Sequence, residues 1–174
     1  FKKRRHLGST LALAVIDVNR FRAFSDDYDD AEGELLLVRI FNSLKKNLCS
    51  GELLTRFSVD QFSLLLILEP EEEPTARVER MTRGLSRLYP SERITCSAGV
   101  YVVTDRGMSV DRLNSLATVA KDKAKQAGAG SVLLFDNTMR DRLVSEQQMT
   151  ASMERALKRG EFVLYLQPKY SVQD

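Results

Sequence analysis

Hydrophobic and polar positions along the chain follow strand-like periods in some segments and helix-like periods in others. Residues 11–18, LALAVIDV, form a near-continuous apolar run, which is typical of a strand buried on both faces, and we place it centrally in a sheet. After the polar stretch SDDYDDAEG, interpreted as a solvated loop, apolar residues recur at helical spacing from Leu36 to Leu48. They predict an amphipathic helix that ends near Gly51.

The pattern continues in the same manner as far as Phe135. ELLTRF and FSLLLIL, on either side of SVDQ, predict a hairpin, and a second helix follows over residues 78–88. Residues 94–102 alternate as a half-buried strand, Ser109 is placed to cap a third helix that Gly128 and Gly130 close, and VLLF is a final strand. This order predicts an α/β (α+β) domain with a mixed sheet flanked by helices.

Beyond Asp136 the pattern changes to a polar helix from about residue 138 to 159, followed by FVLYLQP, which reads as the start of another strand. Nothing follows that strand to pack against it. We therefore expect a domain over residues 1–136, a linker helix over 137–160 and the beginning of a further domain over 161–174.

Composition and charge restrict the partners. Of the 174 residues, 43% are hydrophobic and 29% charged, and the net charge of +2 gives no indication of nucleic-acid binding. Cys49, Cys96 and the single histidine, His6, do not form a metal cluster or a disulfide framework, which favours a reducing cytoplasm. No apolar run reaches the roughly 20 residues of a membrane helix. A membrane anchor upstream of the fragment is compatible with this.

Two acids are the first candidates for chemistry. Asp17 ends the first strand and Asp60 lies in the hairpin turn, so their carboxylates converge if the two strands are neighbours. A pair of carboxylates is a common way to hold Mg²⁺ for phosphoryl chemistry. The spacing alone fits equally well with two acids that only terminate strands.

Four segments between Leu11 and Phe135 together resemble the GGDEF, or diguanylate cyclase, family. IDVNRFRAFSDDYDDAEGELLL is similar to the signature D-x-D-x-F-K-x-I-N-D-x-x-G-H-x-x-G-D-x-x-L, and RFSVDQF falls where the family has R-x-G-G-D/E-E-F. AKDKAKQAG and ITCSAGVY resemble its A-x-x-A-K-x-x-G helix and S-x-G strand. The resemblance implies a palm-like, mainly antiparallel, nucleotidyl-cyclase-like sheet flanked by helices. Active members condense two GTP molecules into cyclic di-GMP across a dimer.

Several site positions keep the family's chemistry. Asp17 and Asp60 match its two metal-binding acids, which implies Mg²⁺ as a cofactor. Arg22 stands at the position of a phosphate-facing lysine, and Lys125 matches the lysine near the end of the third helix. The resemblance thus implies GTP as a ligand and a homodimer in the full-length protein.

Other positions depart from the family. Ser25 and Glu34 replace the asparagine and aspartate that bind the guanine edge, which weakens base discrimination, and Gln61 replaces the second acid of the turn motif. Ser58 and Val59 replace its two glycines. Because a β-branched residue is strained at positive φ, we expect a rearranged turn, with the valine side chain in the space of the nucleotide.

A family inhibitory site, R-x-x-D, would fall on residues 49–52, but CSGE has no arginine, and we do not expect product feedback there. The C-terminal MERALKRGEFVLYLQPKYSV is similar to the opening of an EAL domain, the cyclic di-GMP phosphodiesterase family. Gln167 and Pro168 match its Y-x-Q-P motif. The metal-binding acids of that family would lie beyond Asp174, so this fragment alone cannot hydrolyse cyclic di-GMP.

We therefore expect a degenerate, non-catalytic GGDEF domain that acts as a regulatory or dimerisation module of a GGDEF-EAL protein, with GTP as a ligand that is not turned over. Its partners would be the downstream EAL domain, guanine nucleotide and a second copy. Two alternatives stay open: a weak cyclase that uses Asp17 and Asp60, and a scaffold that binds no nucleotide.

Overall fold

The computed structural model describes residues 9–28, 30–85, 88 and 94–165. They belong to two compact units, Phe1–Met139 and Arg140–Asp174, each of which is described separately. None of the helices among these residues is long and apolar enough to cross a membrane. His6 and Gln167, both named in the sequence predictions, lie outside the described residues.

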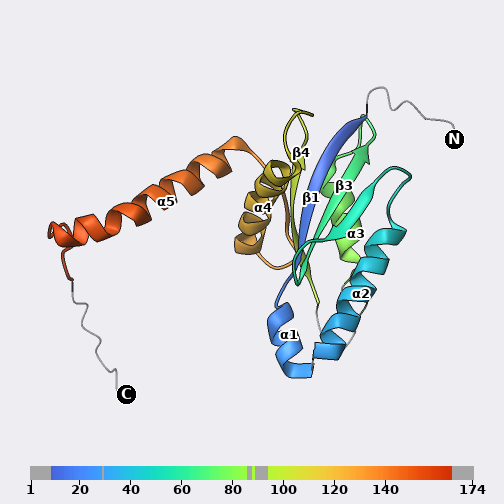
Figure 1. Cartoon of the computed structure of the whole chain (residues 1–174), viewed down its shortest axis with the longest axis horizontal. Helices are drawn as coiled ribbons and strands as arrows, with labels where there is room; N and C mark the ends of the chain where they lie inside the picture. The colour runs from blue at the N-terminus through green and yellow to red at the C-terminus, as the bar shows by residue number, and fades with distance from the viewer. Residues whose placement is uncertain (1–8, 29, 86–87, 89–93, 166–174) are drawn as a thin grey trace, which may run out of the picture. The chain divides into compact units, whose positions relative to one another are not determined.

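A five-stranded sheet forms the centre of the first unit, in the order β2-β3-β1-β4-β5 (Figure 1). The strands are β1 (Thr10–Val18), β2 (Leu53–Arg56), β3 (Gln61–Leu68), β4 (Cys96–Val102) and β5 (Val132–Leu134). All neighbouring pairs are antiparallel except β4 and β5, which run parallel. The predicted mixed, mainly antiparallel sheet with a central first strand is confirmed.

Helices cover both faces of this sheet. They are α1 (Phe21–Tyr28), α2 (Asp30–Lys46), α3 (Pro74–Arg83) and α4 (Val110–Ala127). Even-numbered residues of β1, such as Ile16, belong to the core formed with α2 and α3, whereas Leu13 and Val15 pack against Leu113 and Ala117 of α4. Since side chains alternate along a strand, Asp17 points to the α4 face.

The segment expected to be a loop after β1 is instead helical. Phe21 and Phe24 are buried at helical spacing, and the ring of Phe24 stacks on Tyr28 with centroids 4.7 Å apart. This apolar face stabilises α1 despite the acidic residues around it. The following helix, α2, ends at Lys46 and not at Gly51, which has φ 94° in the turn before β2.

Two strand predictions also need correction. Residues 96–100 of β4 are buried on both faces, because α4 covers one face and α3 packs towards the other, so the strand is not half-buried. Residues 162–165, the described part of FVLYLQP, have no strand structure and are exposed. The isolated segment has no neighbouring strand among the described residues with which to form a ladder.

The helix termini agree better with the sequence. Ser109 caps α4, with its Oγ accepting from the Arg112 N–H at 3.3 Å, and Gly128 ends the helix at φ 142°. The polar helix expected after Asp136 is α5 (Asn137–Lys158).

Candidate functional site

The two predicted acids meet at one end of the sheet. The β1–β3 register pairs Asp17 with Gln61, and the Val18 N–H donates to the backbone oxygen of Asp60 at 3.0 Å. The hairpin turn is thereby fastened to the end of β1. Asp17 and Asp60 share one site because their strands are neighbours.

The carboxylate of Asp17, a residue only 2% exposed, is enclosed by polar groups of the protein itself. Its Oδ1 accepts from Lys125 Nζ at 2.6 Å, and its Oδ2 accepts from Gln61 Nε2 at 3.1 Å. Lys121 Nζ lies 3.6 Å from Oδ2. Gln61, which stands at the second acid of the turn motif, therefore donates to Asp17 at the end of β1.

Lys121 is a site residue that the sequence reasoning missed. It is 4% exposed and lies among the buried residues of α4 that also include Ala117, Ala120 and Ala124. A lysine on the apolar face of a helix was the available signal, because such a group is buried only when a carboxylate compensates its charge.

The approach of α4 to the sheet depends on Gly99 in β4. A Cβ atom there would lie 2.1 Å from the backbone carbonyl oxygen of Ala117 and 2.1 Å from the backbone nitrogen of Lys121. Only glycine allows the α4 backbone to come this close to β4. The close approach brings the Lys121 and Lys125 side chains within reach of Asp17.

Asn19 is a second residue that was missed, at the position of the second acid of D-x-D. Its side-chain nitrogen donates to Thr95 Oγ1 and Ser97 Oγ, each at 3.0 Å. The D-x-D spacing of the family signature was the signal available for this position, where the amide joins β1 to the beginning of β4 and adds no charge to the site.

Asp60 differs from Asp17 in its electrostatics. Partial burial, and then the negative charge of Asp17, raise the pKa of the Asp60 carboxyl above its ordinary value of 3.8. Lys125 and Lys121 act in the opposite direction, without cancelling the increase. The site holds two carboxylates whose charges are not equally compensated.

The turn between β2 and β3 is built without glycine. Neither Ser58 nor Val59 has positive φ, and Arg20 is the one non-glycine residue with positive φ in the described part of the chain. Arg56 supports the turn, because its Nε–H donates to the Val59 carbonyl at 2.9 Å. Its NH1 forms an ion pair with Glu34 Oε1 at 2.7 Å. Glu34, one of the positions predicted to bind nucleotide, is thus engaged in a protein contact.

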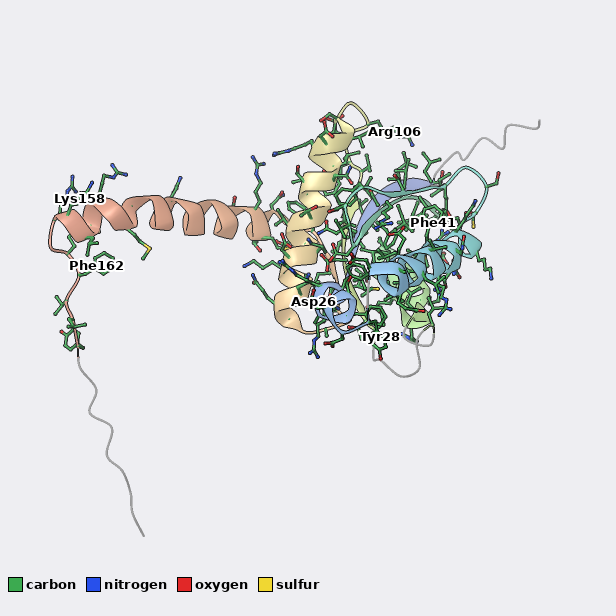
Figure 2. All side chains as sticks on the ribbon, turned by 60° about the horizontal axis from the view of Figure 1, so that its bottom comes forward. Asp26, Tyr28, Phe41, Arg106, Lys158 and Phe162 are labelled. Atoms are coloured by element: carbon green, nitrogen blue, oxygen red, sulfur yellow. The ribbon has the colours of Figure 1, made fainter. Side chains whose placement is uncertain are left out.

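A cleft of about 420 Å³ lies beside this turn, lined by Phe21, Arg22, Ser25, Asp26, Asp30, Val59 and Asp60. Asp26 of α1 is labelled in Figure 2. Ser25 does not face the cleft freely, since its hydroxyl donates to Asp30 Oδ1 at 3.2 Å. Of the positions predicted to bind nucleotide, Arg22, Ser25 and Val59 line this cleft, whereas Glu34, Ser58 and Lys125 are not among the lining residues.

The position of the family's inhibitory site has a structural role in this chain. Glu52, with a fully buried side chain, forms a 2.7 Å ion pair with Arg77 and accepts from the backbone N–H groups of Cys49 and Ile67. Its carboxylate is saturated by these contacts.

The residues around Asp17 do not fit a divalent cation. No cluster of three or more His, Cys, Asp or Glu side chains in the described ranges could hold a metal. The two available carboxylates are Asp17, already compensated by two ammonium groups, and Asp60. One or two carboxylates, with waters and substrate phosphates, are enough to hold Mg²⁺, so the obstacle is the positive charge of the two ammonium groups beside Asp17 and not the number of acids.

Sheet, helices and site together define an α/β domain in which a hairpin turn carries an acid to the end of the central strand. The model of the family described as "Diguanylate cyclase, GGDEF domain" matches residues 1–131, and the chain belongs to this family.

Solved structures agree with the fold. The GGDEF domain of DgcB from Caulobacter crescentus, solved in complex with c-di-GMP, superposes with a TM-score of 0.64 at 20% identity, covering 73% of this chain and 78% of the other. The active GGEEF domain of a diguanylate cyclase from Vibrio cholerae gives 0.60 at 16% identity, covering 74% and 84%.

Curated relatives extend the similarity towards the C-terminus. The "Bifunctional diguanylate cyclase/cyclic di-GMP phosphodiesterase MucR" of Pseudomonas aeruginosa is 25% identical over 162 residues, 91% of this chain and 24% of its own length. The "Cyclic di-GMP phosphodiesterase NbdA" of the same organism is 23% identical over 171 residues, 96% of this chain and 22% of its own. The chain thus spans about a quarter of these relatives.

Proposed function

We propose that the chain is a degenerate, non-catalytic GGDEF domain that regulates an EAL phosphodiesterase domain following it in the full-length protein. The observation that carries this proposal is the 2.7 Å ion pair between Arg56 and Glu34. It engages the carboxylate at the guanine-reading position, and it belongs to a turn that has Ser58 and Val59 in place of two glycines. A cyclase needs both the base contact and the room at this turn.

The charge of the cleft supports the same conclusion. Three carboxylates, Asp26, Asp30 and Asp60, line it together with one guanidinium, that of Arg22. Such a lining repels a triphosphate, so GTP binding in this proposal is weak and does not lead to turnover. The volume of about 420 Å³ is within the usual range for a small ligand.

The regulatory part of the proposal rests on α5 and on the relatives. MucR and NbdA, both named as cyclic di-GMP phosphodiesterases, match more than nine-tenths of the chain. Beyond α5, Phe162 and the next three residues are exposed apolar side chains (Figure 2). We infer that they begin the EAL domain, that α5 transmits the state of the GGDEF domain, and that the full-length protein is a homodimer.

The first experiment measures cyclase activity. The chain is incubated with GTP and Mg²⁺ or Mn²⁺, and cyclic di-GMP is quantified by chromatography. We expect no product above the level of an Asp17→Ala variant. Product that forms with the wild type and disappears in Asp17→Ala would overturn the non-catalytic proposal in favour of a weak cyclase.

The second experiment separates a regulatory domain from a scaffold. Hydrolysis of cyclic di-GMP by the full-length protein is measured with and without GTP, in the wild type and in Arg22→Met. We expect GTP to change the rate in the wild type and not in the variant. If GTP neither changes the rate nor gives a binding isotherm, the scaffold alternative is correct.

A further inference from the structure

Lys121 occupies an unusual position for a lysine. Its side chain is 5% exposed, and it lies on the face of α4 that packs on the sheet, where the neighbouring buried positions are mostly alanine and leucine. Ammonium groups are rarely buried without a partner, because the loss of hydration is costly. The burial of Lys121 therefore requires a compensating charge.

That charge comes from two carboxylates. Lys121 Nζ lies 3.6 Å from Asp17 Oδ2 and 2.9 Å from Oδ1 of Asp122, an exposed residue on the same helix. Asp122 balances the lysine from the solvent side, and Asp17 from the interior. The interior contact exists because Gly99 lets the backbone of α4 touch β4 at this point.

The charge of Asp17 is compensated without any added ion. Lys121 and Lys125 bring two positive charges within 4 Å of its carboxylate. Lys125 is 41% exposed and can swing out into solvent, but Lys121 is enclosed and cannot leave without α4 moving. Lys121 is thus the fixed cation of the site.

We propose that Lys121 is a built-in counter-ion that takes the place of a divalent metal ion at Asp17. A divalent cation beside Asp17 would lie close to an enclosed ammonium group and be repelled by it. The site therefore excludes Mg²⁺ and Mn²⁺, and its acid keeps an ion pair that holds α4 to the end of β1. The proposal rests on the proposed function only in that the site performs no metal-dependent turnover.

The test is Mn²⁺ binding to the whole chain, measured by electron paramagnetic resonance of the free ion. Lys121→Met removes the charge and keeps much of the side-chain volume, Lys121→Arg keeps the charge, and Lys45→Met removes an exposed lysine at the end of α2. We expect Lys121→Met to bind one Mn²⁺ at least about tenfold more tightly than the wild type, a change of about 1.4 kcal/mol. Lys121→Arg and Lys45→Met should behave as the wild type.

The gained site should disappear when Asp17→Asn is added to Lys121→Met, since Asp17 would be its ligand. The proposal is overturned if Lys121→Met folds, as judged by circular dichroism, and gains no Mn²⁺ affinity. It is also overturned if the wild type binds Mn²⁺ tightly and an Asp17→Asn variant that is folded by circular dichroism does not.

These outcomes are distinct from those of the cyclase assay. A wild type that binds Mn²⁺ but makes no cyclic di-GMP would refute the counter-ion and leave the non-catalytic function intact. A wild type that binds no metal and still makes cyclic di-GMP would refute the non-catalytic function and leave the counter-ion proposal intact.

Discussion

Two buried ion-pair clusters lie at opposite ends of the sheet, and they are built differently. At one end Glu52 is held by Arg77 and by two backbone N–H groups, with side chains 0% and 9% exposed. At the other end Asp17 is held by two lysines and a glutamine, and one of the lysines, Lys125, is 41% exposed. A cleft lies beside each cluster. We call the first cluster closed, because both charged side chains are buried, and the second open, because one of its lysines is exposed.

The two clusters differ in how firmly their cations are held. Burial alone would lower the pKa of the Arg77 guanidinium, but the carboxylates of Glu52 and Glu72 outweigh it and raise that pKa above its ordinary value. A planar guanidinium with fixed partners cannot be exchanged for a ligand. Around Asp17, Lys121 is held in place by its burial, whereas the exposed Lys125 can turn to solvent, so only part of this cluster is fixed.

The largest effect is expected at the closed cluster. Glu52→Ala leaves the buried Arg77 with Glu72 as its one remaining carboxylate partner among the described residues, so we expect the free energy of unfolding to fall by about 3–5 kcal/mol. Urea denaturation measures it. Glu52→Gln, which keeps the hydrogen-bond acceptor, should cost less than Glu52→Ala, and a loss below about 1 kcal/mol in Glu52→Ala would show that the cluster is not structural.

Gly99→Ala should act on the open cluster alone. Its Cβ would meet backbone atoms of α4 at 2.1 Å, which cannot yield as a flexible side chain does, so α4 must move outward. We expect a loss of about 3 kcal/mol by urea denaturation, at the upper end for overpacking. Gly84→Ala is the matched control, because nothing lies within 4 Å of its Cβ, and it should be close to neutral. Equal effects of the two substitutions would contradict the close approach.

Asp17→Asn should cost less than Glu52→Ala. Lys121 keeps Asp122 as a partner, and Lys125 can turn to solvent, so we expect a loss of about 1–3 kcal/mol. Adding Lys121→Met to Asp17→Asn should recover part of it, because the enclosed charge is removed together with its partner. A double mutant that is less stable than Asp17→Asn would mean that Lys121 stabilises the fold without Asp17.

The two clusters also differ in how far the sequence could predict them. The strand at residues 11–18 and the signature around Asp17 were sufficient for the fold and for the meeting of Asp17 with Asp60, because antiparallel neighbours and side-chain alternation follow from local patterns. The Glu52–Arg77 pair was not predicted, since its partners are 25 positions apart and meet only through the packing of α3.

The details of the site needed the structure for a similar reason. Lys121 reaches Asp17 only because α4 touches Gly99. The periodicity of a helix in the sequence does not indicate how closely that helix approaches the sheet. Arg56 forms an ion pair with Glu34, which lies on a different element. The glutamate in place of the family's aspartate was interpreted in the sequence as a change in base recognition, but in the structure it supports the turn. The helix at residues 21–28 was missed because its two buried phenylalanines lie among acids that indicated a loop.

A smaller effect is expected from pH. The pKa of Asp60 is raised in the folded state, first by burial and then by Asp17, so the folded state binds a proton more tightly than the unfolded state. The stability associated with this proton is present below the unfolded pKa, near 3.8, and is lost as the pH rises through the folded pKa. Asp60→Asn should therefore gain stability relative to the wild type as the pH rises above about 4.

Urea midpoints of the wild type and Asp60→Asn between pH 3 and pH 7 measure this difference. In the Asp17→Asn background the difference should shrink, since one of the two causes of the raised pKa is removed. A difference that does not depend on pH would mean that Asp60 titrates alike in both states.

The smallest expected effect is on the reactivity of the two cysteines, one of which lies at each cluster. Burial, and then the charge of Asp17, raise the pKa of the Cys96 thiol to about 12, whereas Cys49 is exposed. Since the thiolate is the reactive form, a thiol reagent at pH 8 should modify one cysteine in the native chain, Cys49. In Cys49→Ser, the rate at which Cys96 is modified then reports how often the end of the sheet that carries Asp17 opens. Cys96 belongs to the core on the α2 and α3 face of the sheet, whereas Gly99 meets α4 on the other face, so Gly99→Ala should accelerate that reaction only as far as it lowers the global stability. An acceleration larger than the measured loss of stability would mean that moving α4 also opens the end of β4 locally.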